Sequence, residues 1–305
     1  MTIRVRGGWA PAIWGLAAVV CATTLFATGC GRSGGVSSGQ AFWRVYRIGI
    51  APWVLDAQQK KSIDAFISAL EQAGYSPNYN LEVKIEDAGG SSRAQERIVR
   101  GLASWQADLI YTVTAQGAKI ARDLAPNIPV VFSGVAYPMD LGLVERLEFS
   151  SNQMVGIRSY IPIEEQMAFL MRLIPKEIRR IGMCMRAGDP DSRLILEEIR
   201  ALAVKQGADV LRVEVSDVGG LSRALAEAGP TAEAFYLSCD DLMQGDGAPI
   251  VIDFASRRGL PVLSCGMRAV EKGALAGAVV DEDLSARMAA SHSSGQAART
   301  WASSA

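Results

Sequence analysis

The sequence offers few side chains that could carry out catalysis. Its 305 residues include one histidine, His292, which lies in a Ser/Ala-rich segment. A Ser-His-Asp or Cys-His arrangement would have to use that residue, and a zinc site with several histidines is excluded. The phosphate- and dinucleotide-binding glycine motifs and the Gly-x-Ser-x-Gly motif are also missing. We therefore expect a protein that is not an enzyme and that needs no catalytic residue, cofactor or metal.

The five cysteines fall into two groups. Cys21 and Cys30 lie near the N-terminus, whereas Cys184, Cys239 and Cys265 are widely spaced in the rest of the chain. No Cys-x-x-Cys pair occurs, which argues against zinc binding and thioredoxin-like chemistry. Each of the last three follows or ends a predicted strand. We expect buried free thiols there, with one disulfide as the alternative in an exported protein.

Cys30 suggests a different chemistry, covalent lipid attachment. Arg4 and Arg6 precede an apolar run from about Trp9 to Ala27, and small residues lead into Cys30. A basic head, an apolar run and a small-residue cleavage site form the secretory signal pattern. The cysteine extends this to a lipoprotein signal over residues 1–30, with plain secretion or a retained membrane helix as alternatives. The Gly/Ser-rich residues 31–43 would be a flexible tether on the outer side of a bacterial membrane.

The bulk composition indicates a globular protein. It is 49% hydrophobic, 21% charged and has a formal net charge of −1. No basic cluster recurs with interleaved aromatic residues, so we expect no nucleic-acid partner. Without the signal, the chain is long enough for one large domain or two ordinary ones.

Apolar runs and helical spacings alternate along both halves of the chain. In the first half we predict strands at 46–51, 81–85, 108–113 and 129–133, and helices at 56–73, 91–104 and 116–124. In the second half we predict strands at 180–185, 209–215, 234–237 and 261–264, and helices at 162–173, 191–206, 220–228 and 249–258.

This alternation predicts an α/β fold of two doubly wound parallel-sheet lobes joined near residues 153–160. We expect a first lobe over 44–157, to which 280–305 returns, and a second lobe over 158–279. Ligands of such sheets bind at the carboxyl ends of the strands. The loops there are therefore the candidate site.

Several segments between Arg47 and Asp283 resemble one family, the ABC transporter substrate-binding proteins typified by tryptophan/phenylalanine-binding lipoproteins. The resemblance rests on the order and spacing of short stretches along the chain. They are Ile48-Gly49-Ile50, Leu70 to Tyr75, Asp108 to Ile110, Thr114 to Ala118, Ile128 to Ser133 with Pro138, Asn152 to Gly156, Ile181-Gly182, Asp240, and Lys272 to Ala276.

The resemblance implies a Venus-flytrap fold of the type I, three-crossover kind, with a small ligand in the cleft between the lobes. It implies an ABC permease as partner and a receptor that delivers a zwitterion, such as an amino acid, to it. We expect a monomer. The alternative is a sensory module that couples ligand binding to a different membrane partner.

In the first lobe, Thr112, Thr114 and Gln116 precede or begin a predicted helix, whose N-terminus favours an anion such as a ligand carboxylate. The alternative for Thr114 is a helix cap. Ser133 and Gly134 end the next predicted strand, where a hydroxyl and a bare backbone suit close approach of a carboxylate.

Trp53 follows the first strand and could stack on a planar ligand, or only pack. In the second lobe, Asp240 could pair with a ligand ammonium, with an N-cap as the alternative. Asp191-Ser192 occupies the position of the family's Asn-Ser pair at a helix start, and Tyr137 stands where relatives often carry Asp. These exchanges imply a ligand that need not be tryptophan or phenylalanine.

The C-terminal segment departs from the family pattern. After Asp283 the family continues through a long helix and a strand, whereas Ser285 to Ala305 is Ala/Ser-rich and lacks apolar periodicity. We expect the return to the first lobe to be truncated, and that lobe to be less stable for this reason.

Overall fold

Five parallel strands form the sheet of the first lobe. The computed structural model describes residues 44–302 except 78, 149–150 and 175, so the signal, Cys30 and the tether lie outside the described residues. The strands are β1 (Tyr46–Ile50), β2 (Leu81–Ile85), β3 (Leu109–Thr112), β4 (Val130–Val135) and β5 (Met154–Arg158), in the order β2-β1-β3-β4-β5. The helices are α1 (Ala57–Gln72), α2 (Ser92–Ser104), α3 (Ala115–Leu124) and, late in the chain, α10 (Glu282–Ala302).

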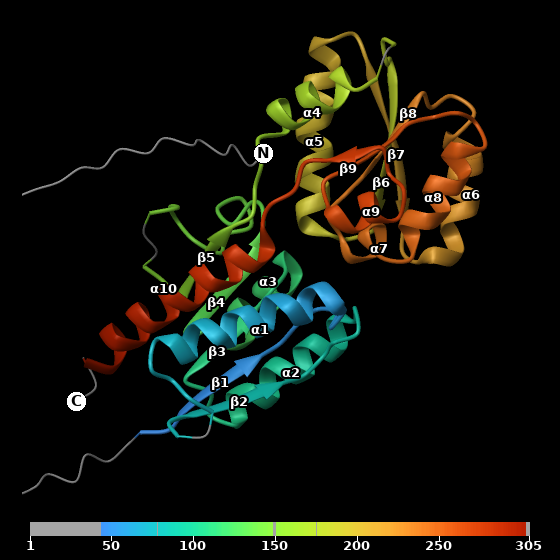
Figure 1. The fold of residues 1–305 in the computed structure, drawn as a ribbon. Helices are drawn as coiled ribbons and strands as arrows, with labels where there is room; N and C mark the ends of the chain where they lie inside the picture. Colours follow the sequence, from blue (N-terminus) through green and yellow to red (C-terminus); the bar gives the residue numbers. More distant parts are fainter. Residues whose placement is uncertain (1–43, 78, 149–150, 175, 303–305) are drawn as a thin grey trace, which may run out of the picture. The chain divides into compact units, whose positions relative to one another are not determined.

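Alternate side chains of these strands enter two cores. Tyr111 of β3 faces α1 and stacks on Phe66, with ring centroids 4.0 Å apart. Its neighbour Ile110 faces the opposite side, in the core that α2 and α3 cover. A strand that is buried on both faces consists mainly of apolar residues. For this reason the sequence predicted a strand over residues 108–113. Figure 1 shows α1 and α10 beside each other on this sheet.

The second lobe repeats the same topology. Its strands are β6 (Arg180–Arg186), β7 (Asp209–Val215), β8 (Ala234–Leu237), β9 (Val262–Ser264) and β10 (Ala276–Gly277). Their order is β7-β6-β8-β9-β10, and all pairs are parallel. As in the first lobe, the second strand in the chain is the edge strand beside the first. The helices are α4 (Ile163–Arg172), α5 (Pro190–Lys205), α6 (Val218–Ala228), α7 (Asp241–Gln244), α8 (Gly247–Ser256) and α9 (Met267–Glu271).

The two parallel α/β lobes agree with the sequence prediction, and most element bounds agree within two residues. Strand β5 was not predicted, because residues 153–160 were interpreted as a connection. Only Met154 is buried, the other four residues are partly buried or exposed, and Gly156 and Arg158 shorten its apolar pattern. The chain passes between the lobes after β5 and again after β10, which gives two of the three crossovers that the resemblance implies.

The expectation that the family's long helix after Asp283 is missing was wrong, because helix α10 forms over residues 282–302. Ala286, Ala289 and Ala290 are almost fully buried in the core that α1 covers. Alanine has the highest helix propensity but little hydrophobic area, so its face gives no clear apolar periodicity. Helix α10 therefore covers apolar surface of the first lobe, so the missing cover that we gave as the reason for lower stability is present.

Candidate functional site

The switch point of each sheet lies where strand order reverses, between β1 and β3 in the first lobe and between β6 and β8 in the second. Open α/β sheets bind ligands outside the carboxyl ends of strands at such points. Both lobes belong to one compact unit. Loops at the carboxyl ends of strands in the two lobes are in contact, because Asp191 accepts from Ala136 N after β4 and Arg186 donates to Gly90 O after β2 and faces the ring of Trp53 after β1.

At the first switch point, Thr114 is the N-cap of α3, and its hydroxyl accepts a hydrogen bond from Gly117 N at 3.1 Å. Thr114 therefore caps the helix, as the alternative interpretation proposed. Gln116 lies in the first turn and is partly exposed. Thr112 is fully buried, and its Oγ1 has no hydrogen-bond partner. A buried hydroxyl without a partner is costly, so its presence here points to a role for a ligand.

Gln95 of α2 joins this group, although the sequence analysis missed it. It is fully buried, donates to Ala51 O at 3.1 Å and leaves Oε1 without a partner. A side chain added at Gly117 would meet both Gln95 Nε2 and Thr114 Oγ1 at 3.3 Å, which places all three together. Gln95 shares the helical stripe of Ile98, and one polar residue on an apolar stripe was the available signal.

Ser133 and Gly134 lie inside β4 and not at its end, because the strand continues to Val135. The register of β4 against β5 shifts between Phe132 and Val135, which marks an irregularity in the ladder. Gly134 has φ +67°, and a Cβ there would lie 2.2 Å from Val113 O. Ser133 is buried, and its hydroxyl is hydrogen-bonded to Tyr111 Oη at 2.8 Å. Part of its hydrogen-bonding capacity is therefore used within the protein.

At the second switch point, Asp240 is held by four donors. Its carboxylate accepts from Arg186 N and Met243 N at 2.8 Å each, from Ser192 Oγ at 3.3 Å and from Ser238 Oγ. It is the N-cap of α7, as the alternative interpretation proposed. Burial raises its pKa, and these hydrogen bonds oppose the rise. Little capacity is left for a ligand ammonium.

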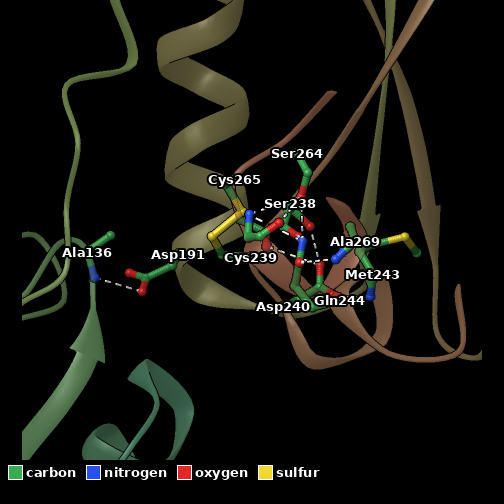
Figure 2. The surroundings of a disulfide bond; sticks show 12 residues. Ala136, Asp191, Ser238, Cys239, Asp240, Met243, Gln244, Ser264, Cys265 and Ala269 are labelled. Carbon is green, nitrogen blue, oxygen red and sulfur yellow. Dashed lines mark hydrogen bonds between the residues drawn. A yellow bond between two sulfur atoms is a disulfide. The ribbon is translucent and has the colours of Figure 1, made fainter. Parts of the chain in front are cut away.

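Asp191 lies in the first turn of α5 and reaches the first lobe. Its Oδ2 accepts from Ala136 N at 2.9 Å (Figure 2), and its Oδ1 accepts from Tyr137 N at 3.3 Å. Burial raises its pKa to about 7, aided by the nearby Asp189, whereas the Ala136 and Tyr137 bonds lower it. Each oxygen keeps a free lone pair, so Asp191 can still accept from a cation.

Asp189 is a further acid at this edge that the sequence analysis missed. It caps α5 by accepting from Ser192 N at 2.8 Å, and burial and then Asp240 raise its pKa to about 6. The charges of Asp240 and Asp241 act on Asp189, and the charge of Asp189 acts on Asp191. Two arginines lie among these acids: Arg186 pairs with Asp241, and Arg158 lowers the pKa of Asp191. The edge is negatively charged when these acids are ionised, and a cationic group would relieve the repulsion.

The loops around Asp240 are joined covalently. Cys239 and Cys265 form a disulfide that links the carboxyl ends of β8 and β9, and Cys184 is a buried free thiol. The expectation of three free thiols was wrong for this pair, and the alternative of one disulfide is the outcome. Gln244 adds a second tie, because its Nε2 donates to Ser238 O at 2.7 Å and to Ser264 Oγ at 3.1 Å (Figure 2).

Trp53 and Tyr137 are both buried in the core cluster that spans parts of both lobes. Tyr137 packs edge-on against Tyr160, with ring centroids 5.3 Å apart. The Trp53 ring faces Arg186, whose Cζ is 5.7 Å from the ring centroid. Their placement serves packing at the junction of the lobes, and contact with a ligand remains a prediction for both.

Two further observations concern the part of the chain that the structure describes. None of the helices placed there is long and apolar enough to cross a bilayer. Within the same residues, the histidine, cysteine, aspartate and glutamate side chains form no group able to hold a metal ion.

Comparison with known proteins identifies the family. Residues 47–292 match the family model described as ABC transporter substrate binding protein. A tyrosine-binding protein of Clostridioides difficile (strain R20291) is 25% identical over 234 residues, which cover 77% of this chain and 67% of that protein.

Two solved structures share the fold. The ABC domain from Streptococcus pneumonia in complex with L-Trp has a TM-score of 0.75 at 18% identity, with 81% of this chain and 83% of that chain covered. A conserved domain protein from Vibrio cholerae O1 biovar El Tor gives 0.76 at 19% identity, with 83% and 84% covered. With two lobes of equal topology and a family match over most of its length, the chain belongs to the ABC transporter substrate-binding protein family.

Proposed function

We propose that this protein is an extracytoplasmic receptor that holds one small zwitterionic ligand, an amino acid or a related compound, between the switch points of its lobes. The observation that carries the proposal is the contact between strand-end loops of the two lobes, where Asp191 accepts from Ala136 N and Arg186 donates to Gly90 O. The first lobe offers the anion-favouring start of α3 at its strand ends, and the second lobe offers an acidic edge. The two ends of a zwitterion have opposite charges and suit these two edges.

The carboxylate end suits the first lobe. The N-terminus of α3 presents main-chain N–H groups and the positive end of the helix dipole. Thr112 Oγ1, buried and without a protein partner, can donate one hydrogen bond. A ligand carboxylate there would satisfy a group that the protein leaves unsatisfied.

The ammonium end suits the second lobe. Asp191 keeps free acceptor capacity, whereas Asp240 is occupied by four donors. We therefore assign the ammonium contact to Asp191 in preference to Asp240, reversing the emphasis of the sequence analysis. A charge-assisted hydrogen bond between a ligand ammonium and the buried Asp191 carboxylate would also favour the ionised form of Asp191.

The relatives support an amino acid. The Clostridioides difficile protein is named for tyrosine, and the Streptococcus structure contains L-Trp. Both are zwitterions with an aromatic side chain, and Trp53 lies near the proposed site. By the family's role, the ligand would pass to an ABC permease, and Cys30 would anchor a monomeric receptor by lipid outside the cytoplasm.

The experiment is a thermal-shift panel of the twenty amino acids and small amines on the full chain, purified in mild detergent. A ligand present at 100 times its dissociation constant stabilises the folded state by about 2.7 kcal/mol, which gives a clear rise in melting temperature. We expect an amino acid to stabilise the protein and to be recovered unchanged. No response to any amino acid, or chemical turnover of the ligand, would contradict the proposal.

A further inference from the structure

Arg186 bonds within the second lobe through its main chain and reaches the first lobe through its side chain. It is the last residue of β6, and its N–H donates to Asp240 Oδ2 at 2.8 Å. Its guanidinium pairs with Asp241 in the second lobe and donates from Nη2 to Gly90 O of the first lobe at 2.9 Å. The same guanidinium faces the ring of Trp53. One side chain therefore contacts both lobes.

On the first-lobe side of this contact, the two loops after β1 and β2 are joined by a main-chain hydrogen bond. Gly90 N donates to Trp53 O at 2.7 Å, so the carbonyl that Arg186 binds belongs to a residue tied to Trp53. Gly90 has φ +74°, a conformation that favours glycine. A Cβ at Gly90 would lie 3.3 Å from Arg186 Nη1, so the guanidinium approaches the bare backbone closely.

The planar guanidinium is required for this arrangement. Arg186 has 24% and Asp241 16% of its side chain exposed, so both charges are largely removed from water. A guanidinium has five donors in a fixed fork and can serve a carboxylate and a carbonyl in different directions while facing an aromatic ring. An ammonium is a compact point charge on a flexible stem and cannot reproduce these three contacts together.

We propose that Arg186 is a positioning residue that holds the Trp53–Gly90 loop of the first lobe against the second lobe and thereby slows the release of bound ligand. The claim about ligand release rests on the proposed function. The claim that Arg186 holds the two lobes together does not depend on it. Arg186 acts at the strand end that also anchors Asp240, so the contact is made at the site itself and not at the outer surface.

The first test measures ligand exchange in the full chain. The probe is L-tyrosine or L-tryptophan, whichever stabilises the wild-type protein, and stopped-flow fluorescence gives association and dissociation rates. Arg186→Ala and Arg186→Lys should both release the ligand about tenfold faster, since a hydrogen bond to a charged group is lost, with association changed much less. Arg193→Ala, which changes an exposed arginine of the same lobe, is the matched control.

The lysine variant separates positioning from charge. If Arg186 only neutralises Asp241, lysine would restore the wild-type release rate. That result would overturn the proposal, and so would equal release rates in wild type and Arg186→Ala. Fast release in both variants, with the Arg193→Ala control unchanged, supports it.

The second test needs no ligand. Spin labels at Glu71→Cys in α1 and Val204→Cys in α5, both exposed positions, report the distance between the lobes. We expect Arg186→Ala to broaden this distance distribution and to shift it to longer values. An unchanged distribution would overturn the inference even where wild type binds an amino acid, whereas a wild-type protein that binds none would refute the proposed function alone.

Discussion

Replacement of Asp191 by asparagine should change the free energy of unfolding in a pH-dependent way. In the folded protein the pKa of Asp191 is raised from 3.8 to about 7, first by burial. A raised carboxyl pKa means that the folded state favours the protonated acid. The stabilisation is fully present below the unfolded pKa and is lost as the pH rises through the folded pKa.

The magnitude follows from the shift. About three pKa units correspond to about 4 kcal/mol, and partial exposure of the side chain reduces this to roughly 2 kcal/mol. Asparagine carries no charge at any pH but can accept only one of the two bonds from Ala136 N and Tyr137 N, which costs about 1 kcal/mol. We therefore expect Asp191→Asn to be more stable than wild type at pH 8 by about 1 kcal/mol, and no more stable than wild type at pH 4.5.

Urea unfolding followed by circular dichroism at both pH values measures this difference. Asp253→Asn is the control, because the pKa of that exposed acid is lowered by its hydrogen bond with Arg257, so the variant should gain no stability at pH 8. If Asp191→Asn were destabilised by the same amount at pH 4.5 and pH 8, the reasoning about its buried charge would be refuted.

Three further predictions concern other residues of the two sheets and their loops. Thr112→Val removes a buried hydroxyl without a partner, so it should stabilise the ligand-free protein by about 1 kcal/mol and weaken ligand binding. A lower urea midpoint for the variant would contradict this. Gly134→Ala should lower stability by at least about 2 kcal/mol more than Gly188→Ala, because both have positive φ but only Gly134 would meet a carbonyl; equal melting temperatures would refute the steric argument. Reduction of Cys239–Cys265, 26 residues apart in sequence, should cost about 3 kcal/mol, and an unchanged melting temperature in reductant would argue against that bond.

The fold was largely predictable because buried parallel strands and amphipathic helices leave clear patterns. Leu109 to Tyr111 of β3 are large side chains buried on both faces of the sheet, and α2 has a single, mainly apolar stripe. Helix α10 escaped prediction because its buried face consists of alanines, and β5 because it is only partly buried.

The candidate site was predictable in position more than in detail. The rule that ligands bind at strand ends selected loops through which the two lobes make contact, but the partners of each side chain depend on tertiary contacts. The sequence favoured Asp240 for the ligand ammonium, yet Asp240 is occupied by four donors, whereas Asp191 bridges the lobes. Arg186 gave no signal, because an arginine at a strand end is ordinary until its partner Gly90 is known. The Cys239–Cys265 pairing was likewise invisible from spacing alone.

Hydrogen exchange with and without a bound amino acid tests the central claim most directly. Ligand held between the two switch points should protect main-chain amides in residues 51–56 and 112–117 of the first lobe and in residues 186–192 and 238–244 of the second lobe, all in the same complex. Protection confined to one lobe, or located at the amino ends of the strands, would contradict the account.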